Sequence, residues 1–149
     1  MTDTTFLEAY LAISEVKARY CRLLDTKDWS GFARLLTEGF ELDVSEGTSV
    51  PLIRGREAAV KQIQSSVASA RTAHQVHSPE IRLGGTDEAH VIWAMQDRVV
   101  WPPERAARMG NLGHTGYGQY HERYIKCRDG RWRIANQRLT RLHVDVHLG

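Results

Sequence analysis

The N-terminal part of the chain has hydrophobic residues at the spacing of a helix. Between residues 5 and 25 they recur in steps of three and four positions, which places them on one face of an amphipathic helix: Phe6, Tyr10, Ile13, Val16, Tyr20, Leu23 and Leu24. A second, short helix fits "DWSGFARLL", with Asp28 as its N-cap. A strand is predicted at "FELDVS", and a third helix over residues 55–69 has a buried stripe formed by Ala59, Val60, Ile63 and Val67.

From residue 72 onward the hydrophobic period changes to two, which is the period of a half-buried strand. In "AHVIWAMQDRVVW" every second residue is apolar, with the exception of Asp97. The segments "YGQYHERYIKC" and "WRIANQRLTRLHVDV" follow, and "RDG" between them contains the Asp-Gly pair of a hairpin turn. Helices first and antiparallel strands second predict an α+β fold, in which about three helices pack on a curved, mostly antiparallel sheet around an apolar pocket.

The segment 101–116, "WPPERAARMGNLGHTG", interrupts this pattern. Its prolines and glycines argue against a regular element, so we predict a long loop between two strands. Such loops often bind ligands or act as lids, although disorder is nearly as common. His114 lies in this segment and is a candidate pocket residue, whereas a solvated histidine is the more common state of such a position.

Length and composition narrow the class of protein. At 149 residues, with 42% hydrophobic and 26% charged residues, the chain fits one globular domain over residues 1–149. No apolar stretch approaches the length of a membrane span and the first ten residues lack a signal-peptide pattern, so we expect a cytoplasmic protein without a membrane partner. The net charge of +2 is too small to indicate a nucleic-acid partner, and Cys21 and Cys127 indicate no disulfide framework.

Asp97 is the clearest anomaly in the pattern. It falls on the apolar face of its strand, where a carboxylate is costly unless it is paired or protonated. Desolvation raises the pKa of such a group, which suits a catalytic acid or base. A surface ion pair with Arg98, or a bulge that turns Asp97 outward, are the structural alternatives. Trp93 and Met95 on the same face indicate a pocket for an apolar, ring-shaped molecule.

Other polar residues allow both a functional and a structural explanation. Asp25 ends the first helix, where the helix dipole disfavours a carboxylate, although a turn-forming role in "DTKD" is the simpler explanation. Tyr20 lies on the buried stripe and needs a hydrogen-bond partner. "HVDVH" places His143, Asp145 and His147 on one side of a strand, as a metal site requires, but fraying is expected there and we expect no metal.

Many arginines near the C-terminus could form a phosphate-binding face: Arg123, Arg128, Arg131, Arg133, Arg138 and Arg141. Glu122 and Asp129 lie among them, together with alternating apolar residues. This mixture predicts a solvated hairpin face instead.

His74 and His77 lie three positions apart in "TAHQVHSPEI", which reads as a strand, so their side chains point to opposite faces. If Ile81 and Leu83 face inward, the alternation places His77 inward and His74 outward. A bulge at Ser78–Pro79 would reverse this assignment, because proline disrupts a strand ladder.

Four segments in this order resemble a known family: "RYCRLLDTKDW", "AHQVHSPEI", "IWAMQDRVVW" and "YIKCRDGRWRI". Together they are similar to the SnoaL-like branch of the nuclear-transport-factor-2-like superfamily, which includes bile-acid dehydratase and, more distantly, scytalone dehydratase and hexachlorocyclohexane dehydrochlorinase. The resemblance covers nearly the whole chain. It implies a cone-shaped curved sheet that is closed by helices around an apolar pocket.

The resemblance also implies roles for single residues. It places Tyr20, Asp25, His74 and Asp97 in the active site, makes Arg141 a pocket arginine, and favours the first histidine of the pair. On this basis we expect a cofactor-independent lyase or isomerase, most simply a dehydratase, in which His74, held by Asp25, removes a carbon-bound proton. Tyr20 would donate to a developing enolate, Asp97 would protonate a leaving hydroxyl or hold His74, and Arg141 would bind an anionic group.

The main alternative is a non-catalytic small-molecule-binding or assembly protein, because the fold does not fix the function. A metal enzyme that uses "HVDVH", or His74 with His77, is a third possibility. Polyketides and steroids are candidate substrates for the enzyme. A large curved sheet with an apolar outer surface favours a homodimer or homotrimer.

Overall fold

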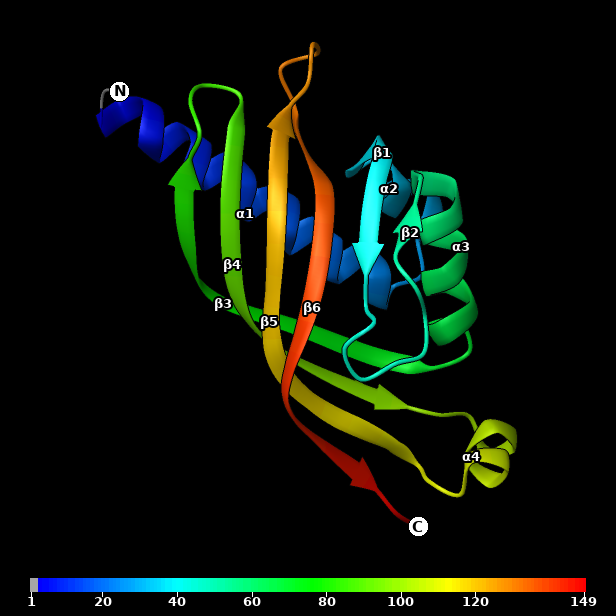
Figure 1. The fold of residues 1–149 in the computed structure, drawn as a ribbon. Helices are drawn as coiled ribbons and strands as arrows, with labels where there is room; N and C mark the ends of the chain where they lie inside the picture. Colours follow the sequence, from blue (N-terminus) through cyan, green and yellow to red (C-terminus); the bar gives the residue numbers. More distant parts are fainter. Residues whose placement is uncertain (1–2) are drawn as a thin grey trace.

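The computed structural model describes residues 3–149 (Figure 1). The helices are α1 (Asp3–Asp25), α2 (Trp29–Ala33), α3 (Arg56–Val67) and α4 (Pro103–Met109), and the strands are β1 (Leu36–Asp43), β2 (Ile53–Arg54), β3 (Arg71–Leu83), β4 (Glu88–Val100), β5 (Gly113–Lys126) and β6 (Trp132–His147). Among these residues, no helix combines the length and the apolar character needed to cross a membrane.

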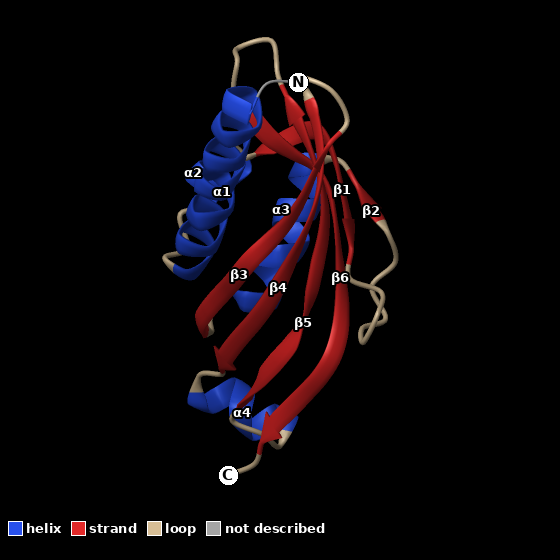
Figure 2. Ribbon diagram, turned by 90° about the vertical axis from the view of Figure 1, so that its left-hand side faces the viewer, coloured by secondary structure: helices blue, strands red, loops and turns tan. Residues whose placement is uncertain are grey.

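The strands form one curved, open sheet in the order β2-β1-β6-β5-β4-β3. All neighbouring strands are antiparallel except β1 and β6, which are parallel. Helices α1 and α3 lie on one face of the sheet, where α1 packs against β3 and β6 and α3 packs against β1 (Figure 2). The predicted α+β class and the mostly antiparallel sheet are therefore confirmed, with one helix more than expected.

Burial along the long elements follows the hydrophobic pattern. On β4 the residues at every second position from Ala89 to Val99 are buried, and Asp97 is buried with them. The stripe of α1, represented by Ile13, Tyr20 and Leu24, packs against this inner face of the sheet. The core thus lies between the helices and the inner face of the sheet, and it includes residues of β1 and α3 as well as of α1 and β4–β6.

The predicted loop 101–116 was wrong, because α4 occupies its first half. Prolines are tolerated at the start of a helix, where the missing N–H has no partner to lose, and Pro102 is the N-cap with Pro103 directly after it. Gly110 ends the helix in the left-handed conformation with a φ of 67°. The residues that seemed to exclude a helix are therefore its two caps. His114 belongs to β5 rather than to a loop.

A bulge in β3 determines which histidine faces inward. His77 pairs with Ala94 and Glu80 pairs with Ile92, so two residues of β3, Ser78 and Pro79, are opposite a single residue of β4. The extra residue lies at Ser78–Pro79 and shifts the alternation by one position. His74 consequently shares the inner face with Ile81, and His77 is exposed on the other face.

Candidate active site

A cavity of about 240 Å³ lies between the helices and the sheet, beyond the C-terminal end of α1. Most of its lining is apolar and comes from α1, α3, β4, β6 and the end of β1 with the residue after it: Leu24, Leu42, Val44, Ile63, Val67, Val99 and Leu139. Polar side chains from several elements converge on it: Tyr20, His74, Asp97, His114, Tyr120, Gln137 and Arg141. A larger hollow of about 700 Å³ follows Arg82, His90 and Arg123 on the opposite face of the sheet, without a comparable buried polar cluster. We therefore place the candidate site in the smaller cavity.

Asp25 and His74 form a hydrogen-bonded pair at one wall of the cavity. Asp25 is the last residue of α1, so its side chain reaches across to β3. Its Oδ1 lies 2.6 Å from Nδ1 of His74, and its Oδ2 accepts the backbone N–H of His74 at 2.8 Å. The Thr72 hydroxyl also donates to Oδ1 at 2.8 Å, and Lys27 donates to that hydroxyl at 2.7 Å. The end of α1 thus fixes the orientation of the His74 imidazole on β3, although the two elements are far apart in the sequence.

The Asp25 carboxyl is ionised near neutral pH. Burial acts to raise its pKa, but the hydrogen bonds from the ring and backbone of His74, the charge of His74 and the bond from Thr72 outweigh burial, so the pKa is lowered overall. An ionised carboxylate only accepts hydrogen bonds, and therefore Nδ1 of His74 carries the proton of the neutral ring. Nε2 of His74 then holds the lone pair, and none of residues 3–149 forms a hydrogen bond to it.

Asp97 and Arg141 form a second pair, next to the first. Asp97 is directly opposite His74 across β3 and β4. Its two oxygens accept two hydrogen bonds from the Arg141 guanidinium, at 2.8 and 2.9 Å, and Nε2 of His114 lies 3.9 Å from its Oδ2. Burial acts to raise the pKa of Asp97, but the proximity of His114 and the bonds and charge of Arg141 hold it well below its usual range. Asp97 is therefore a carboxylate, because Arg141 compensates for the burial that would otherwise raise its pKa.

Gly116 on β5 makes room for this ion pair. It lies opposite Asp97 in the sheet, and an added Cβ there would collide with Nη1 of Arg141 and Oδ1 of Asp97. The backbone of Arg141 is held independently, because its N–H donates to Glu46 at 3.0 Å. Gly116 thus leaves the space that the Asp97 carboxylate and the Arg141 guanidinium occupy.

The sequence patterns missed a fully buried ion pair beneath the cavity. Nζ of Lys17 on α1 lies 2.5 Å from Oε1 of Glu122 on β5, and both side chains have an exposed fraction of 0%. Lys17 Nζ also lies 4.0 Å from the ring centre of Tyr20 and 3.7 Å from that of Tyr120. The prediction that Glu122 belongs to a solvated face was wrong. Glu122 has the same strand parity as Tyr120, and Lys17 falls on the stripe of Tyr20, so both could have been noticed in the way Asp97 was.

This pair is extended by three further side chains. Gln137 donates from Nε2 to Oε1 of Glu122 at 2.5 Å, and the Tyr20 hydroxyl donates to Oε1 of Gln137 at 2.9 Å. The Tyr124 hydroxyl donates to Oε2 of Glu122 at 2.6 Å. A bulge in β6 between Ile134 and Asn136 places Gln137 on the inner face. Tyr20 thus has the partner that its burial requires, and burial raises the pKa of its hydroxyl.

The remaining predicted residues divide into two groups. Arg141 and His114 line the cavity, whereas Trp93 and Met95 do not: both are buried in the core that α1 covers. Met95 touches the site indirectly, because its sulfur lies 3.9 Å from Nη1 of Arg141. In "HVDVH", His143 bonds to Asp145, and no three potential metal ligands cluster within residues 3–149.

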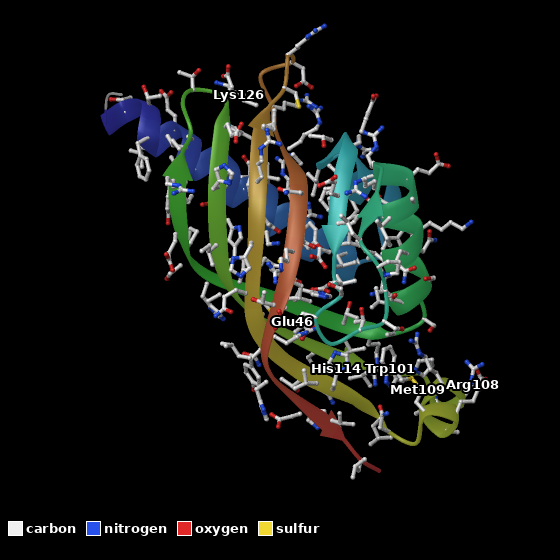
Figure 3. The ribbon with its side chains drawn as sticks, viewed as in Figure 1. Glu46, Trp101, Arg108, Met109, His114 and Lys126 are labelled. Atoms are coloured by element: carbon white, nitrogen blue, oxygen red, sulfur yellow. The ribbon has the colours of Figure 1, made fainter. Side chains whose placement is uncertain are left out.

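The far end of the cavity is lined by α4 and its neighbours. Trp101 and His114 lie next to each other there, with ring centres 6.0 Å apart (Figure 3). Arg105 of α4 stacks on Trp101 at 3.9 Å and donates to the backbone oxygen of Ser66 on α3 at 2.8 Å. This contact joins α4 to α3 across the end of the cavity.

A curved open sheet with helices on one face is the fold of the nuclear-transport-factor-2-like α+β proteins, which this chain shares. The chain belongs to the SnoaL-like domain family, whose family model matches residues 5–138.

Similar proteins cover nearly all of the chain. Probable cyclase FGR4 of Gibberella zeae is 24% identical in an alignment of 144 residues that covers 91% of this chain and 93% of that protein. The crystal structure of a scytalone dehydratase-like protein of Novosphingobium aromaticivorans has a TM-score of 0.84 and 22% identity, and covers 99% of this chain and 93% of its own. A hexachlorocyclohexane dehydrochlorinase (LinA) of type 2 has a TM-score of 0.80 and 15% identity, over 99% and 95%. These structural matches show the fold.

Proposed function

We propose that the protein is a cofactor-independent lyase or isomerase of the dehydratase type, acting on an apolar, cyclic carbonyl compound. The observation that supports this most directly is the Asp25–His74 pair, in which Nδ1 of His74 lies 2.6 Å from a carboxylate oxygen while the other face of the ring borders the cavity. An imidazole held by a carboxylate is a general base with a defined orientation.

The proposed step begins at a carbon next to a carbonyl group. Nε2 of His74 takes the proton from this carbon, and the electron pair of the C–H bond forms an enolate. The enolate then forms a C=C bond as the C–O bond of a β-hydroxyl group breaks, and the proton on His74 leaves with that oxygen as water. Asp25 stabilises the imidazolium that exists between these events. Proton transfer by a positioned base contributes about 10²–10⁴-fold to the rate.

Asp97 and Arg141 have a different part in this proposal from the one first expected. Because Asp97 is ionised and bound to Arg141, it is a hydrogen-bond acceptor for the departing hydroxyl rather than its acid. Its negative charge also lies at the strand position opposite His74, on the neighbouring strand. Arg141 is committed to Asp97, and its main effect is to keep this carboxylate in place.

The names of the similar proteins agree with this reaction type. A dehydratase and a dehydrochlorinase both carry out eliminations, which need a positioned base and a path for the leaving group but no redox cofactor. A probable cyclase is also among the similar proteins. The small, mostly apolar cavity suits a compact ring system, and His114 beside Trp101 supplies a polar contact at its far end.

The proposal is tested with His74→Gln, with His77→Gln as the matched control. His77 lies on the other face of the same strand, so its substitution tests any general effect on β3. With a panel of cyclic β-hydroxy ketones and substrate depletion as the measurement, we expect His74→Gln to lower turnover by about 100-fold or more, and His77→Gln to leave it unchanged. Thermal unfolding checks that both variants fold.

Near-normal turnover by His74→Gln would refute the assignment. A wild-type protein that binds members of the panel but converts none of them would favour the non-catalytic binding protein.

A further inference from the structure

Two tyrosines border the cavity, and their hydroxyl groups are in different hydrogen-bonding states. Tyr20 and Tyr120 are both almost completely buried, with exposed fractions of 3% and 4%, and their ring centres are 6.1 Å apart. Either hydroxyl could contact a bound molecule. The direction of the hydrogen bonds around them decides what each one can do.

The buried ion pair determines the direction of the bonds at Tyr20. Glu122, paired with Lys17, only accepts hydrogen bonds, so the side of Gln137 that faces it must be the NH₂ group. The carbonyl oxygen of Gln137 therefore faces Tyr20, and the Tyr20 hydroxyl has to donate to it. The hydroxyl proton of Tyr20 is therefore engaged in the hydrogen bond to Gln137. Toward the cavity, Tyr20 offers only lone pairs.

Tyr120 lacks such an acceptor. Among residues 3–149 none accepts a hydrogen bond from its hydroxyl, although the ring is buried and the residue lines the cavity. Its hydroxyl oxygen is not sealed off in the way that the unpartnered polar atoms of Ser14 and Trp93 are. A buried phenol normally has a partner, and a ligand oxygen would supply it. Lys17 lies 3.7 Å from the ring centre, where its charge draws electron density from the phenol.

We propose that Tyr120 is a catalytic residue that donates a hydrogen bond to the carbonyl oxygen of the bound substrate, and that Tyr20 is a positioning residue that accepts a hydrogen bond from a substrate hydroxyl. This inference rests on the proposed function, in which a carbonyl compound occupies the cavity. It replaces the role first expected of Tyr20, whose proton is bound to Gln137. The substrate class is thereby narrowed to compounds with both a carbonyl and a hydroxyl group.

The surroundings of Tyr120 suit an enolate. When the α-proton leaves, negative charge collects on the carbonyl oxygen, and a donor that is already in place stabilises it without rearrangement. Burial, followed by electrostatic interactions with Tyr20 and Asp97, raises the pKa of Tyr120 well above its ordinary value, so the proton stays on the tyrosine and the hydroxyl remains a hydrogen-bond donor. Asp97 and Arg141 lie close enough to interact with this hydroxyl electrostatically.

The test compares Tyr120→Phe with Tyr20→Phe, each of which removes one hydroxyl and keeps the ring. The probe is 1-tetralone, a bicyclic ketone that has an acceptor and no donor. Its binding is measured by titration, and its carbonyl stretch by infrared difference spectroscopy. In the wild type we expect the stretch to move to lower wavenumber. In Tyr120→Phe we expect this shift to disappear and binding to weaken about tenfold. In Tyr20→Phe the shift should remain.

Three results would overturn the inference: a carbonyl shift that survives in Tyr120→Phe, a shift that is lost in Tyr20→Phe alone, or a wild-type protein that does not bind or perturb 1-tetralone. Near-ultraviolet circular dichroism checks the packing of both variants. The measurement needs no turnover, and His74→Gln should give the wild-type shift. Failure of the proposed function would thus appear in the turnover of His74→Gln, whereas failure of this inference appears only in the carbonyl spectrum.

Discussion

Three carboxylates lie in or beneath the cavity, and each has a partner of a different kind. Asp25 bonds an imidazole, Asp97 bonds a guanidinium, and Glu122 bonds an ammonium. At Asp25 and Asp97, the partners of the carboxyl group lower its pKa by more than burial raises it. Asp97 is almost completely buried and nevertheless keeps a low pKa, because Arg141 contacts both of its oxygens.

At the scale of single residues, Asp97→Asn should reduce the stability of the protein in a pH-dependent way. The variant leaves the half-buried charge of Arg141 without a counter-ion, and we expect a loss of about 3 kcal/mol at pH 7. Because folding lowers the pKa of Asp97, its contribution is present above its ordinary value of 3.8 and is lost as the pH falls through the lower, folded value. The difference between wild type and variant should therefore shrink in acid.

Urea unfolding at pH 7 and at several acidic pH values measures this effect. Asp129→Asn is the matched control, because Asp129 also has a bidentate arginine partner, Arg133, but lies exposed to solvent that screens the pair. We expect this control to behave like the wild type. Equal stability of Asp97→Asn and wild type at pH 7 would contradict the account of the pair.

At the scale of elements, removing one partner of the ion pair between α1 and β5 should lower the free energy of unfolding more than removing both charges. Lys17→Met leaves Glu122 charged in the core, for which we expect a loss of about 3–5 kcal/mol. Lys17→Met with Glu122→Gln removes both charges and should recover most of this loss. Denaturant unfolding of the two single variants and the double variant gives the coupling energy. A double variant no more stable than Lys17→Met would disprove the coupling.

The regular elements were predictable because each carries many residues of one period. Helix α1, helix α3 and strands β3–β6 follow from the change of the hydrophobic period from about 3.6 to two. Helix α4 was missed because its prolines and glycine were read as loop residues, when Pro102 and Gly110 are its caps. A seven-residue helix offers too few positions to show a period.

The candidate site was predictable only in part, for a physical reason. Asp97 could be identified because it is the one charged residue among the alternating apolar residues of its own strand. The pairing of Asp97 with Arg141, and of Lys17 with Glu122, depends on contacts between elements that no local pattern contains. Likewise, the alternation around His74 and His77 could not settle which faces inward, since it depends on a bulge that adds one residue to β3.

At the scale of the whole molecule, the end of the sheet farthest from α1 exposes apolar side chains in β6 and near α4: Met109, Leu112, Leu142, Val144, Val146 and Leu148. Such a surface favours association with another copy, and the expected homodimer or homotrimer remains a prediction. Light scattering should give two or three times the 16.9 kDa of one chain.

Val144→Asp should lower that mass, while Leu7→Asp, at an exposed apolar position on α1, serves as the control. A wild-type mass of a single chain would contradict the prediction.

The bulge in β3 makes the residue that faces the cavity depend on the length of the strand. Deleting one residue at Ser78–Pro79 would restore regular alternation, turn His74 to the outer face and bring a neighbour such as Gln75 inward, while Asp25 stayed where α1 ends. Substitutions at Ser78 would leave the register as it is. At this point of the chain, the number of residues in β3 decides which side chain faces the cavity more than their identity does. Inserting or deleting a single codon here would replace His74, the proposed general base, by another side chain on the inner face. The chemistry of the site could therefore change without any substitution among the residues that line the cavity.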